Sequence, residues 1–488
     1  MTVSRQPDPR PIPFWDAAEL SAAIRERRVS CVEVMTAHLD HIDALNPQVN
    51  AIVMLRPREE LMAAAAEKDA LLDADCYQGW MHGFPHAVKD LADVRGFPTT
   101  YGFFRPDEVP VATQDSVFVE RIRAAGAIFV GKTNTPEFGL GSHTSNNVFG
   151  TTRNAYDQAR SAGGSSGGAA VAVALRMLPV ADGSDFMGSL RNPPGWNNVL
   201  GLRPSFGRVP GAGEDVFHAQ GAVDGPIART AEDLALLLRT MSGYDARAPL
   251  SIGEDLPETG ASVAGRSVAW LGDLGGYLPM DPEVLRVCES ALGAFTELGM
   301  SVSPLDGLPT SAGFAGNADL WPLWLIYRHW LAGGKLAALH AMPELRARLK
   351  PEAVFEVKGV GPLTARDVYD CGVKRSAMYQ AFAEVFDTHD YVVLPTAQVF
   401  PFAAEQDWPS RVNGVGMSSY HRWMEVSTIG TLLNAPTLAM PAGFSRGGLP
   451  IGLQVIGRNH ADASLLDLAS AWERQTPWAQ RAPALLLG

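Results

Sequence analysis

The stretch GGSSGGAAVAVALRMLPVADGSDFMGSLR, residues 163–191, places a helix and a strand between two segments rich in glycine and serine. Residues 167–177 are apolar on nearly every side of a helix, which is typical of a helix buried in a core. The short apolar segment 178–183 follows it and reads as a strand. Because a buried helix leads directly into a buried strand, this stretch predicts an α/β architecture.

The same alternation continues on both sides of this stretch. We expect helices at 58–74, 116–126, 230–241, 282–299 and 463–475, and strands at 49–55, 127–131, 267–272, 391–396 and 452–457. Such alternation implies helices layered against a largely buried sheet.

Two early helices carry start signals. Asp16 with Glu19, and Ser30 with Glu33, have the spacing of a capping box ahead of an apolar helical pattern. His38 and His41 share a face of the second helix. Two residues do not complete a metal shell, so we interpret this face as solvated.

The pattern is least regular between about 305 and 365. Four large aromatic residues fall in one short stretch there: Trp321, Trp324, Tyr327 and Trp330. We interpret them as a helix that packs aromatic rings into a core, with a substrate-facing wall as the alternative. The proline-rich residues 1–13 lack a packing face and predict an extended segment.

Composition excludes several functional classes. The 488 residues are 46% hydrophobic, with a net charge of −13 and no long run of one sign, so nucleic acid is not an expected partner. No segment approaches the roughly 18 apolar residues that a membrane span requires, so we expect no membrane partner and a cytoplasmic protein. The four scattered cysteines suggest neither a disulfide framework nor a zinc site.

The segment GAIFVGKT, residues 126–133, matches the phosphate-binding pattern G-x-x-x-x-G-K-[ST]. In a true phosphate loop, the four central residues curl so that backbone N–H groups surround an anion. Here they are Ala127, Ile128, Phe129 and Val130, which suit a strand. We therefore keep an ATP-binding protein using residues 126–133 only as a remote alternative.

The glycine segment also matches G-x-S-x-G, at Ser165 and again at Ser166. The nucleophile elbow of an α/β-hydrolase needs a strand immediately before it, and the preceding segment is polar and irregular. Three histidines could serve as a base in that interpretation, namely His329, His389 and His421, but no spacing selects one.

A third signal follows the strand, where the turn 182–189 is rich in glycine and serine. Such a turn can present several backbone N–H groups in one direction, as an oxyanion hole demands.

Taken together, HAVKD (86–90), GGSSGG (163–168) and GSDFMGSLR (183–191) resemble the amidase signature family in order and spacing. The resemblance extends from about residue 14 to the end. It implies one amidase domain, 14–488, with a single large α/β/α fold whose central mixed, mostly parallel sheet is covered by helices on both faces. Residues 305–365 would be its variable, substrate-shaping part.

The resemblance implies a Ser-cis-Ser-Lys triad. Ser189 would be the nucleophile, Ser165 the bridging serine, and Lys89 the base. The peptide bond between Gly164 and Ser165 would be cis. Ser166 and Gly164 would support the triad without reacting.

It further implies an oxyanion hole formed by backbone N–H groups, those of Phe186, Met187, Gly188 and Ser189. Asp185 and Arg191 would fix these donors. The family usually has two glycines before the nucleophile, where this chain has Met187-Gly188, so a positive φ at position 187 would be strained.

The chemistry can also be argued from the residues. A lysine acts as a base only when neutral, and its reference pKa is near 10.4, so burial must lower that value. Lys89 ends an apolar segment and suits this requirement.

We expect a cofactor-free and metal-free amidohydrolase. It would act on C–N acyl bonds of small to medium apolar or aryl amides, with possible side activity on anilides, carbamates and esters. Its partner would be a small-molecule amide, and a homodimer is left open. The alternative is that the chain forms part of a tRNA-dependent glutamine amidotransferase, as the subunit that shares these motifs.

Overall fold

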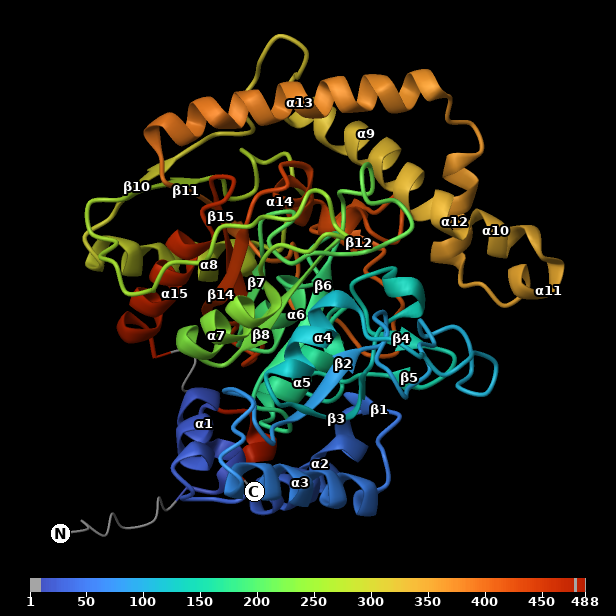
Figure 1. The fold of residues 1–488 in the computed structure, drawn as a ribbon. Coiled ribbons are helices and arrows are strands. Elements are labelled where there is room, and N and C mark those ends of the chain that lie inside the picture. The colour runs from blue at the N-terminus through green and yellow to red at the C-terminus, as the bar shows by residue number, and fades with distance from the viewer. Residues whose placement is uncertain (1–9, 478–480, 488) are drawn as a thin grey trace.

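The computed structural model describes residues 10–477 and 481–487 (Figure 1). Its α-helices are α1 (Ala17–Arg25), α2 (Cys31–Val49), α3 (Arg58–Asp73), α4 (Val117–Ala124), α5 (Gly167–Ala174), α6 (Asn192–Trp196), α7 (Ala231–Met241), α8 (Pro282–Glu297), α9 (Asn317–Arg328), α10 (Gly334–Ala341), α11 (Pro343–Arg346), α12 (Pro351–Val360), α13 (Ala365–Thr388), α14 (Thr428–Leu432) and α15 (Asp462–Gln475). Its strands are β1 (Ile52–Val53), β2 (Pro85–Lys89), β3 (Ile128–Thr133), β4 (Ser145–Asn146), β5 (Gly150–Thr151), β6 (Ala181–Asp185), β7 (Leu200–Arg203), β8 (Val223–Ala228), β9 (Ser267–Trp270), β10 (Ser301–Pro304), β11 (Tyr391–Pro395), β12 (Arg411–Val412), β13 (Val415–Gly416), β14 (Thr437–Phe444) and β15 (Pro450–Gly457).

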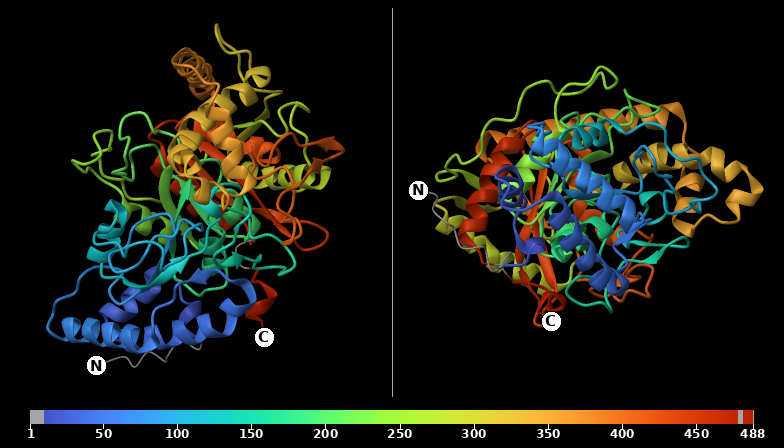
Figure 2. Two further views of the ribbon diagram at one scale, coloured as in Figure 1. Left: turned by 90° about the vertical axis from the view of Figure 1, so that its right-hand side faces the viewer. Right: turned by 60° about the horizontal axis from the view of Figure 1, so that its bottom comes forward.

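Within the described residues, the main sheet has eight strands in the order β10-β9-β11-β15-β14-β7-β8-β6. Helix α15 contacts both α7 and α8, and these three helices cover one side of this sheet, whereas α6 packs on the other (Figure 2). The helix α13 lies across one end of the molecule beside α9 (Figure 1). A mixed sheet enclosed by helices confirms the predicted α/β fold class.

One part of the fold prediction is wrong: the sheet is not mostly parallel. In the described chain only two of its seven strand pairs are parallel, β10 with β9 and β9 with β11. The strands β9 and β10 are joined through the helix α8, which permits a parallel pair. A short turn joins β14 to β15, so these two strands pair antiparallel as a hairpin.

A smaller sheet, β1-β3-β2, lies beside the main one. Its strand β2 contacts the edge strand β6, and the carboxylate of Asp182 bridges the seam. One oxygen accepts the backbone N–H of Lys89 at 3.1 Å, and the other lies 3.0 Å from His86 Nε2. This seam brings the end of β2 next to the end of β6.

The segment that resembles a phosphate loop is part of a strand. All six residues of β3 are buried, and β3 lies between β1 and β2. Lys132 Nζ donates to the carbonyl of Ala92 at 2.6 Å and lies 3.5 Å from Asp90 Oδ1. A strand with its lysine engaged inside the core cannot wrap a phosphate, so the predicted strand is confirmed and the ATP-binding alternative is wrong.

Only one of the two predicted capping boxes forms. Ser30 and Glu33 make both reciprocal bonds at the start of α2. At the start of α1, Glu19 pairs instead with Arg10 at 2.7 Å. The carboxylate of Asp233, on α7, accepts from the backbone N–H groups of Ala17 at 3.0 Å and Ala18 at 2.9 Å. A carboxylate from a distant helix thus replaces the local cap.

The face of α2 that carries two histidines is not solvated, contrary to prediction. His38 is buried, and its Nδ1 lies 3.1 Å from the carbonyl of Met177. His41 Nε2 lies 2.7 Å from the carbonyl of Leu175. Both rings satisfy carbonyls just beyond α5, which explains why polar residues occur on a packed face.

The region 305–365 is largely helical, in contrast to its irregular sequence pattern. It holds α9 to α12 and a π-helical turn at His329–Gly333. Trp324 and Tyr327 are buried, as the core interpretation predicts, and their rings contact Phe186 at centroid distances of 5.6 and 6.3 Å. This region therefore reaches the turn that carries Ser189.

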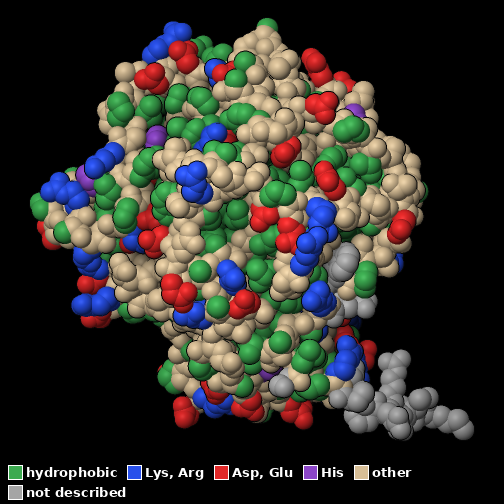
Figure 3. Space-filling model, turned by 180° about the vertical axis from the view of Figure 1, so that it is seen from behind, with side chains coloured by type: hydrophobic (Ala, Val, Ile, Leu, Met, Phe, Trp, Pro, Cys, Tyr) green, Lys and Arg blue, Asp and Glu red, His purple; other side chains and the backbone are tan. Residues whose placement is uncertain are grey.

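On the face of the molecule seen in Figure 3, acidic and basic side chains are interspersed. In the described part of the chain, no helix combines the length and apolar character needed to cross a membrane.

The distant cap of α1 can be tested by comparing two aspartates. We expect Asp233→Ala to lower the free energy of unfolding by about 1–2 kcal/mol, because two N–H groups of α1 lose their acceptor. We expect Asp16→Ala to change it by less than about 0.5 kcal/mol, because the half-exposed side chain of Asp16 makes no cap hydrogen bond and lies 3.8 Å from Arg229. Denaturant titration measures both values, and equal losses would contradict this account.

Candidate active site

Three segments bring hydroxyl groups around one buried amine, which a fourth segment supplies. Lys89 ends β2, Ser165 and Ser166 precede α5, Ser184 lies in β6, and Ser189 lies in the turn between β6 and α6. Because β2 and β6 lie side by side and α5 precedes β6 in the chain, these segments converge at one end of both strands.

The three residues predicted as a triad are brought together. Lys89 Nζ lies 2.7 Å from Ser165 Oγ, and Ser165 Oγ lies 3.0 Å from Ser189 Oγ. All three side chains are buried or nearly so. A continuous hydrogen-bond path therefore joins the amine to the hydroxyl of Ser189.

Neutral oxygens surround the amine of Lys89. Its Nζ donates to Ser166 Oγ at 2.9 Å and lies 2.9 Å from Ser184 Oγ and 3.3 Å from the Ser184 carbonyl. Ser166 Oγ donates its own proton to that carbonyl, so it accepts from the amine. Burial lowers the pKa of Lys89 to about 7, although Asp224, Asp185 and Asp182 act in the opposite direction.

The glycine segment lets the chain approach closely at this point. The Gly164–Ser165 peptide bond is cis, as expected from the sequence. A Cβ on Gly164 would lie 2.8 Å from the backbone nitrogen of His143, so only glycine fits there. The carbonyl of Gly164 accepts from Ser142 Oγ at 2.8 Å, which fixes the segment further.

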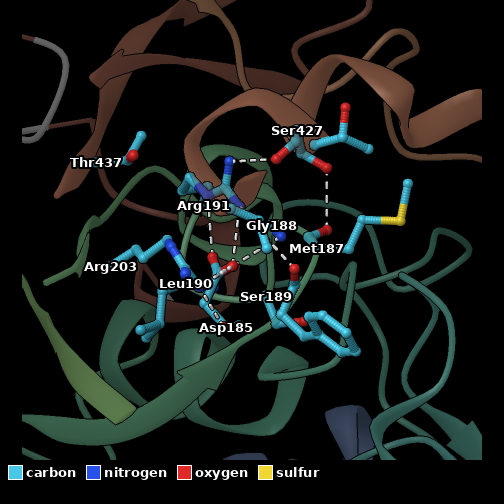
Figure 4. A network of polar contacts seen from close by, with 12 residues as sticks. Asp185, Met187, Gly188, Ser189, Leu190, Arg191, Arg203, Ser427 and Thr437 are labelled. Carbon is cyan, nitrogen blue, oxygen red and sulfur yellow. Dashed lines mark hydrogen bonds and ion pairs between the residues drawn. The ribbon is translucent and has the colours of Figure 1, made fainter. Parts of the chain in front are cut away.

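Asp185 and Arg191 fix the turn that carries Ser189 (Figure 4). The Asp185 carboxylate accepts from the backbone N–H groups of Gly188 and Leu190, each at 3.0 Å. It also forms a two-point ion pair with Arg191, at 2.9 and 2.8 Å. The guanidinium groups of Arg191 and Arg203 hold the pKa of this fully buried carboxyl well below its usual range, against the effect of burial.

Every N–H donor of Arg191 has an acceptor. Besides Asp185, it donates to the Ser427 carbonyl at 2.7 Å, Gln454 Oε1 at 2.7 Å and Thr431 Oγ1 at 3.2 Å. A guanidinium has five N–H donors, and these contacts use all five. The side chain therefore ties the turn to α14 and β15.

The carbonyls of the turn are held on the side away from its free donors. Arg203 donates to the Asp185 carbonyl at 2.5 Å, and Thr431 Oγ1 donates to the Phe186 carbonyl at 2.7 Å. In a trans peptide, the N–H and C=O groups point in opposite directions. The Phe186 N–H shares a peptide with the Asp185 carbonyl and so points away from Arg203. The Met187 N–H shares a peptide with the Phe186 carbonyl and so points away from Thr431.

The set of four predicted backbone donors needs a correction. The peptide between residues 187 and 188 is held on both sides. Its N–H, that of Gly188, donates to Asp185 at 3.0 Å, and its carbonyl, that of Met187, accepts from Ser427 Oγ at 3.0 Å. Within residues 10–477 and 481–487, the N–H groups of Phe186, Met187 and Ser189 have no acceptor. Three of the four predicted donors are therefore free.

The strain considered for Met187 does not arise. Gly188, with a φ of 94°, takes the left-handed conformation, and a Cβ there would lie 2.9 Å from Ser427 Cβ. Met187 needs no such conformation, and its side chain is buried. The one glycine that the turn requires is thus present.

The histidines considered as an alternative base have other contacts. His329 Nδ1 lies 2.8 Å from Glu356 Oε2, His389 Nε2 lies 2.9 Å from Ser303 Oγ, and His421 Nδ1 lies 3.2 Å from Ser419 Oγ. The basic group that lies within hydrogen-bond distance of Ser165 Oγ is the amine of Lys89, at 2.7 Å. In the described part of the chain, none of these three histidines makes a hydrogen bond with Ser165 or Ser166.

Sequence reasoning missed several residues of the site. Ser184 belongs to the turn that is rich in glycine and serine. It lies two residues after Asp182 in β6, so the period of a strand could have placed both side chains on the face toward β2. Arg203, Ser427 and Thr431 act on the turn from other parts of the chain, and no local pattern marks them.

The buried amine predicts a pH-dependent stability. The pKa of Lys89 is about 7 in the folded protein and about 10.4 in an unfolded chain, so the unfolded state binds an extra proton between these values. Stability contributed by this residue therefore rises as the pH increases from 7 to 10. We expect the free energy of unfolding of the wild type, minus that of Lys89→Met, to increase across this interval in denaturant titrations.

A matched variant, Lys358→Met on the surface helix α12, should keep the pH dependence of the wild type. A difference between wild type and Lys89→Met that stays constant with pH would show that the amine is charged in the folded state.

Comparisons with known proteins show the family of this chain. A family model described as Amidase matches residues 33–466. The chain is 36% identical to an acylamidase of Rhodococcus erythropolis, over 96% of this chain and 97% of that protein. It is 31% identical to a subunit of the glutamyl-tRNA(Gln) amidotransferase of Methylococcus capsulatus, over 96% of this chain and 98% of that protein.

The structural similarity is equally extensive. The crystal structure of a bacterial aryl acylamidase of the amidase signature family superposes with a TM-score of 0.89 at 29% identity, covering 96% of this chain and 98% of that chain. The chain belongs to the amidase signature family and is an amidohydrolase that acts on C–N bonds.

Proposed function

We propose that this chain hydrolyses amides through an acyl-enzyme on Ser189, with Lys89 as the base and Ser165 as the proton relay. The observation that carries this proposal is the path of 2.7 and 3.0 Å from Lys89 Nζ through Ser165 Oγ to Ser189 Oγ. Both distances lie in the range of hydrogen bonds.

Proton transfer along this path is consistent with the charge state of the amine. With a pKa of about 7, a large fraction of Lys89 is neutral near pH 7. A neutral amine can donate its two protons to Ser166 and Ser184 and keep its lone pair for the proton of Ser165. Ser165 in turn accepts the proton of Ser189, whose oxygen attacks the carbonyl carbon.

The free backbone donors would stabilise the tetrahedral intermediate. The N–H groups of Phe186, Met187 and Ser189 are available to an oxyanion, and the contacts of Asp185, Arg191 and Thr431 hold them in place before substrate binds. Donors that need no reorganisation are worth several kcal/mol in the transition state. The proton on Lys89 then returns through Ser165 to the departing amine, and water hydrolyses the acyl-enzyme.

The substrate class that we propose is apolar or aryl amides, with anilides, carbamates and esters as secondary substrates. Phe186, next to the oxyanion donors, is partly exposed and packs against Trp324 and Tyr327. An aromatic wall suits an apolar or aryl group. The names of two similar proteins, an acylamidase and an aryl acylamidase, support the same class.

A second candidate function is that of the corresponding subunit in a tRNA-dependent glutamine amidotransferase. The 31% identity to such a protein over nearly the whole chain favours it. Glutaminase activity of the isolated protein, together with no turnover of aryl amides, would select this candidate over the first.

The triad predicts the outcome of three substitutions assayed on a panel of amides, anilides, carbamates, esters and glutamine. We expect Ser189→Ala and Lys89→Ala to lower kcat/KM by at least about a thousandfold, because members of such a unit act together. Ser205→Ala is the control and should keep wild-type activity, because the hydroxyl of this buried serine accepts from the backbone N–H of His460 at 3.0 Å. Activity retained in Lys89→Ala, with its fold intact, would refute the proposed base.

The orientation of the oxyanion donors can be tested through Thr431. We expect Thr431→Val to lower kcat about tenfold with little change in KM, because the peptide that presents the Met187 N–H loses its anchor. Thr428→Val is the matched control, since its hydroxyl donates to the Glu425 carbonyl at 2.7 Å and does not touch the turn. Equal kinetics in the two variants would argue against this anchoring.

A further inference from the structure

The hydroxyl of Ser165 lies next to a glycine of the 3-10 turn Glu137–Gly139, which follows β3. A Cβ atom added to Gly139 would lie 3.4 Å from Ser165 Oγ and 3.8 Å from Ser165 Cβ. It would also lie 2.9 Å from Cδ1 of Leu91, which comes two residues after Lys89. A side chain at position 139 would therefore point toward the Ser165 hydroxyl, and only Leu91 and Ser165 supply the three atoms nearest to that point.

This turn is held firmly in place. The N–H of Phe138 donates to the Tyr101 carbonyl at 2.7 Å, and the carboxylate of Glu137 accepts from the backbone N–H of Lys350 at 2.9 Å. Phe138 has a φ of 51°, in the left-handed region that residues with a Cβ rarely adopt. Such conformations persist only where the surroundings determine them, and they cluster at active and ligand-binding sites.

The surface around the turn is apolar and reaches the solvent. Leu91, Phe138 and Gly139 are each partly exposed, whereas Ser165 is buried. The ring of Phe138 packs against that of Phe103 at a centroid distance of 5.0 Å. An apolar surface that a ligand can reach thus lies beside the buried hydroxyl of Ser165.

We propose that the amine portion of the substrate binds against Gly139 and Leu91, and that these two residues determine how large a group the leaving nitrogen can carry. This inference rests on the proposed function, in which Ser165 returns a proton to the departing amine. When the C–N bond breaks, the nitrogen keeps the bonding electron pair and takes the proton from Ser165 Oγ.

The roles of the two serines orient the scissile amide. Ser189 Oγ bonds to the carbonyl carbon, and the backbone donors of its turn hold the oxygen. A proton donor lies within about 2.6–3.2 Å of the atom that it protonates, so the leaving nitrogen lies next to Ser165 Oγ. The group on that nitrogen then meets Gly139 and Leu91, which lie at the same hydroxyl, and the acyl portion is directed elsewhere.

The substrate class follows from these two side chains. Gly139 has no Cβ to occupy the position 3.4 Å from Ser165 Oγ, so the nitrogen can carry a group larger than hydrogen. Leu91 and Phe138 offer apolar surface to that group, and a flat or apolar group gains from such contact. The site therefore favours secondary amides of an apolar or aryl amine.

The experiment compares three substrates with one acyl group: the primary amide, the N-methyl amide and the anilide of the acyl group that the wild type hydrolyses fastest in the substrate panel. We expect Gly139→Ala to lower kcat/KM for the anilide at least about tenfold more than for the primary amide. One methylene in a pocket changes specificity by roughly 10–200-fold. The N-methyl amide should fall between the two.

Leu91→Phe fills the same space without a change at Gly139, where φ is 71°, so it serves if Gly139→Ala does not fold. It should lower the same ratio of anilide to primary amide. Gly414→Ala is the matched control, since its φ is 80° and no atom lies within 4 Å of the added Cβ. Its ratio should equal that of the wild type. Because both substrates are measured on one sample, the ratio does not depend on the folded fraction.

The outcomes separate this inference from the proposed function. Ratios in Gly139→Ala and Leu91→Phe that match the wild type would overturn the inference, as would an equal loss for all three substrates, which would assign the turn a purely structural role. Wild-type protein that hydrolyses primary amides but no anilide would also overturn it, and both results leave the proposed function standing. Wild-type protein that hydrolyses no member of the panel would overturn the proposed function and this inference with it.

Discussion

The arrangement of this site depends on keeping one amine buried among neutral oxygens. The groups within hydrogen-bond distance of Lys89 Nζ are three serine hydroxyls and a carbonyl, and the carboxylate of Asp182 binds the backbone nitrogen of Lys89 instead of its side chain. A carboxylate in direct contact would fix the charge on the amine. The seam between the two sheets thus anchors the lysine through its main chain, and with a pKa of about 7 a large fraction of its side chain is neutral near pH 7.

A second buried network differs from the site of Lys89, because it consists of a carboxylate and a guanidinium that both remain charged. Asp185 and Arg191 lie inside the protein with every hydrogen-bond donor of the guanidinium satisfied. Removing one member of such a pair leaves an isolated buried charge, which costs several kcal/mol. The turn that carries Ser189 is therefore held by fixed charges, whereas the amine of Lys89, with a pKa of about 7, can change its charge.

Sequence reasoning identified the parts of this molecule that are encoded locally. The box at Ser30 and Glu33 lies within one helical turn, and the helix and strand between residues 167 and 183 follow from periodicity alone. The triad residues came from motifs whose family is known. The start of α1 was missed in detail because its cap, Asp233, lies 216 residues away. The strand directions were partly wrong because alternation of helices and strands does not reveal which strands are neighbours in the sheet. The occupied N–H of Gly188 depends on side-chain contacts that spacing does not encode.

The two histidines of α2 have a consequence for acid tolerance. Burial lowers the pKa of His38 to about 3, and it also lowers the pKa of His41, so both rings are neutral in the folded protein. As the pH falls below about 6.5, these histidines bind protons in the unfolded chain but not in the folded chain. The free energy of unfolding therefore decreases. The carbonyls that these rings hold lie just past the C-terminal end of α5, whose other end carries Ser165 and Ser166. Acid would thus loosen the scaffold behind the serines through a helix that takes no part in the chemistry.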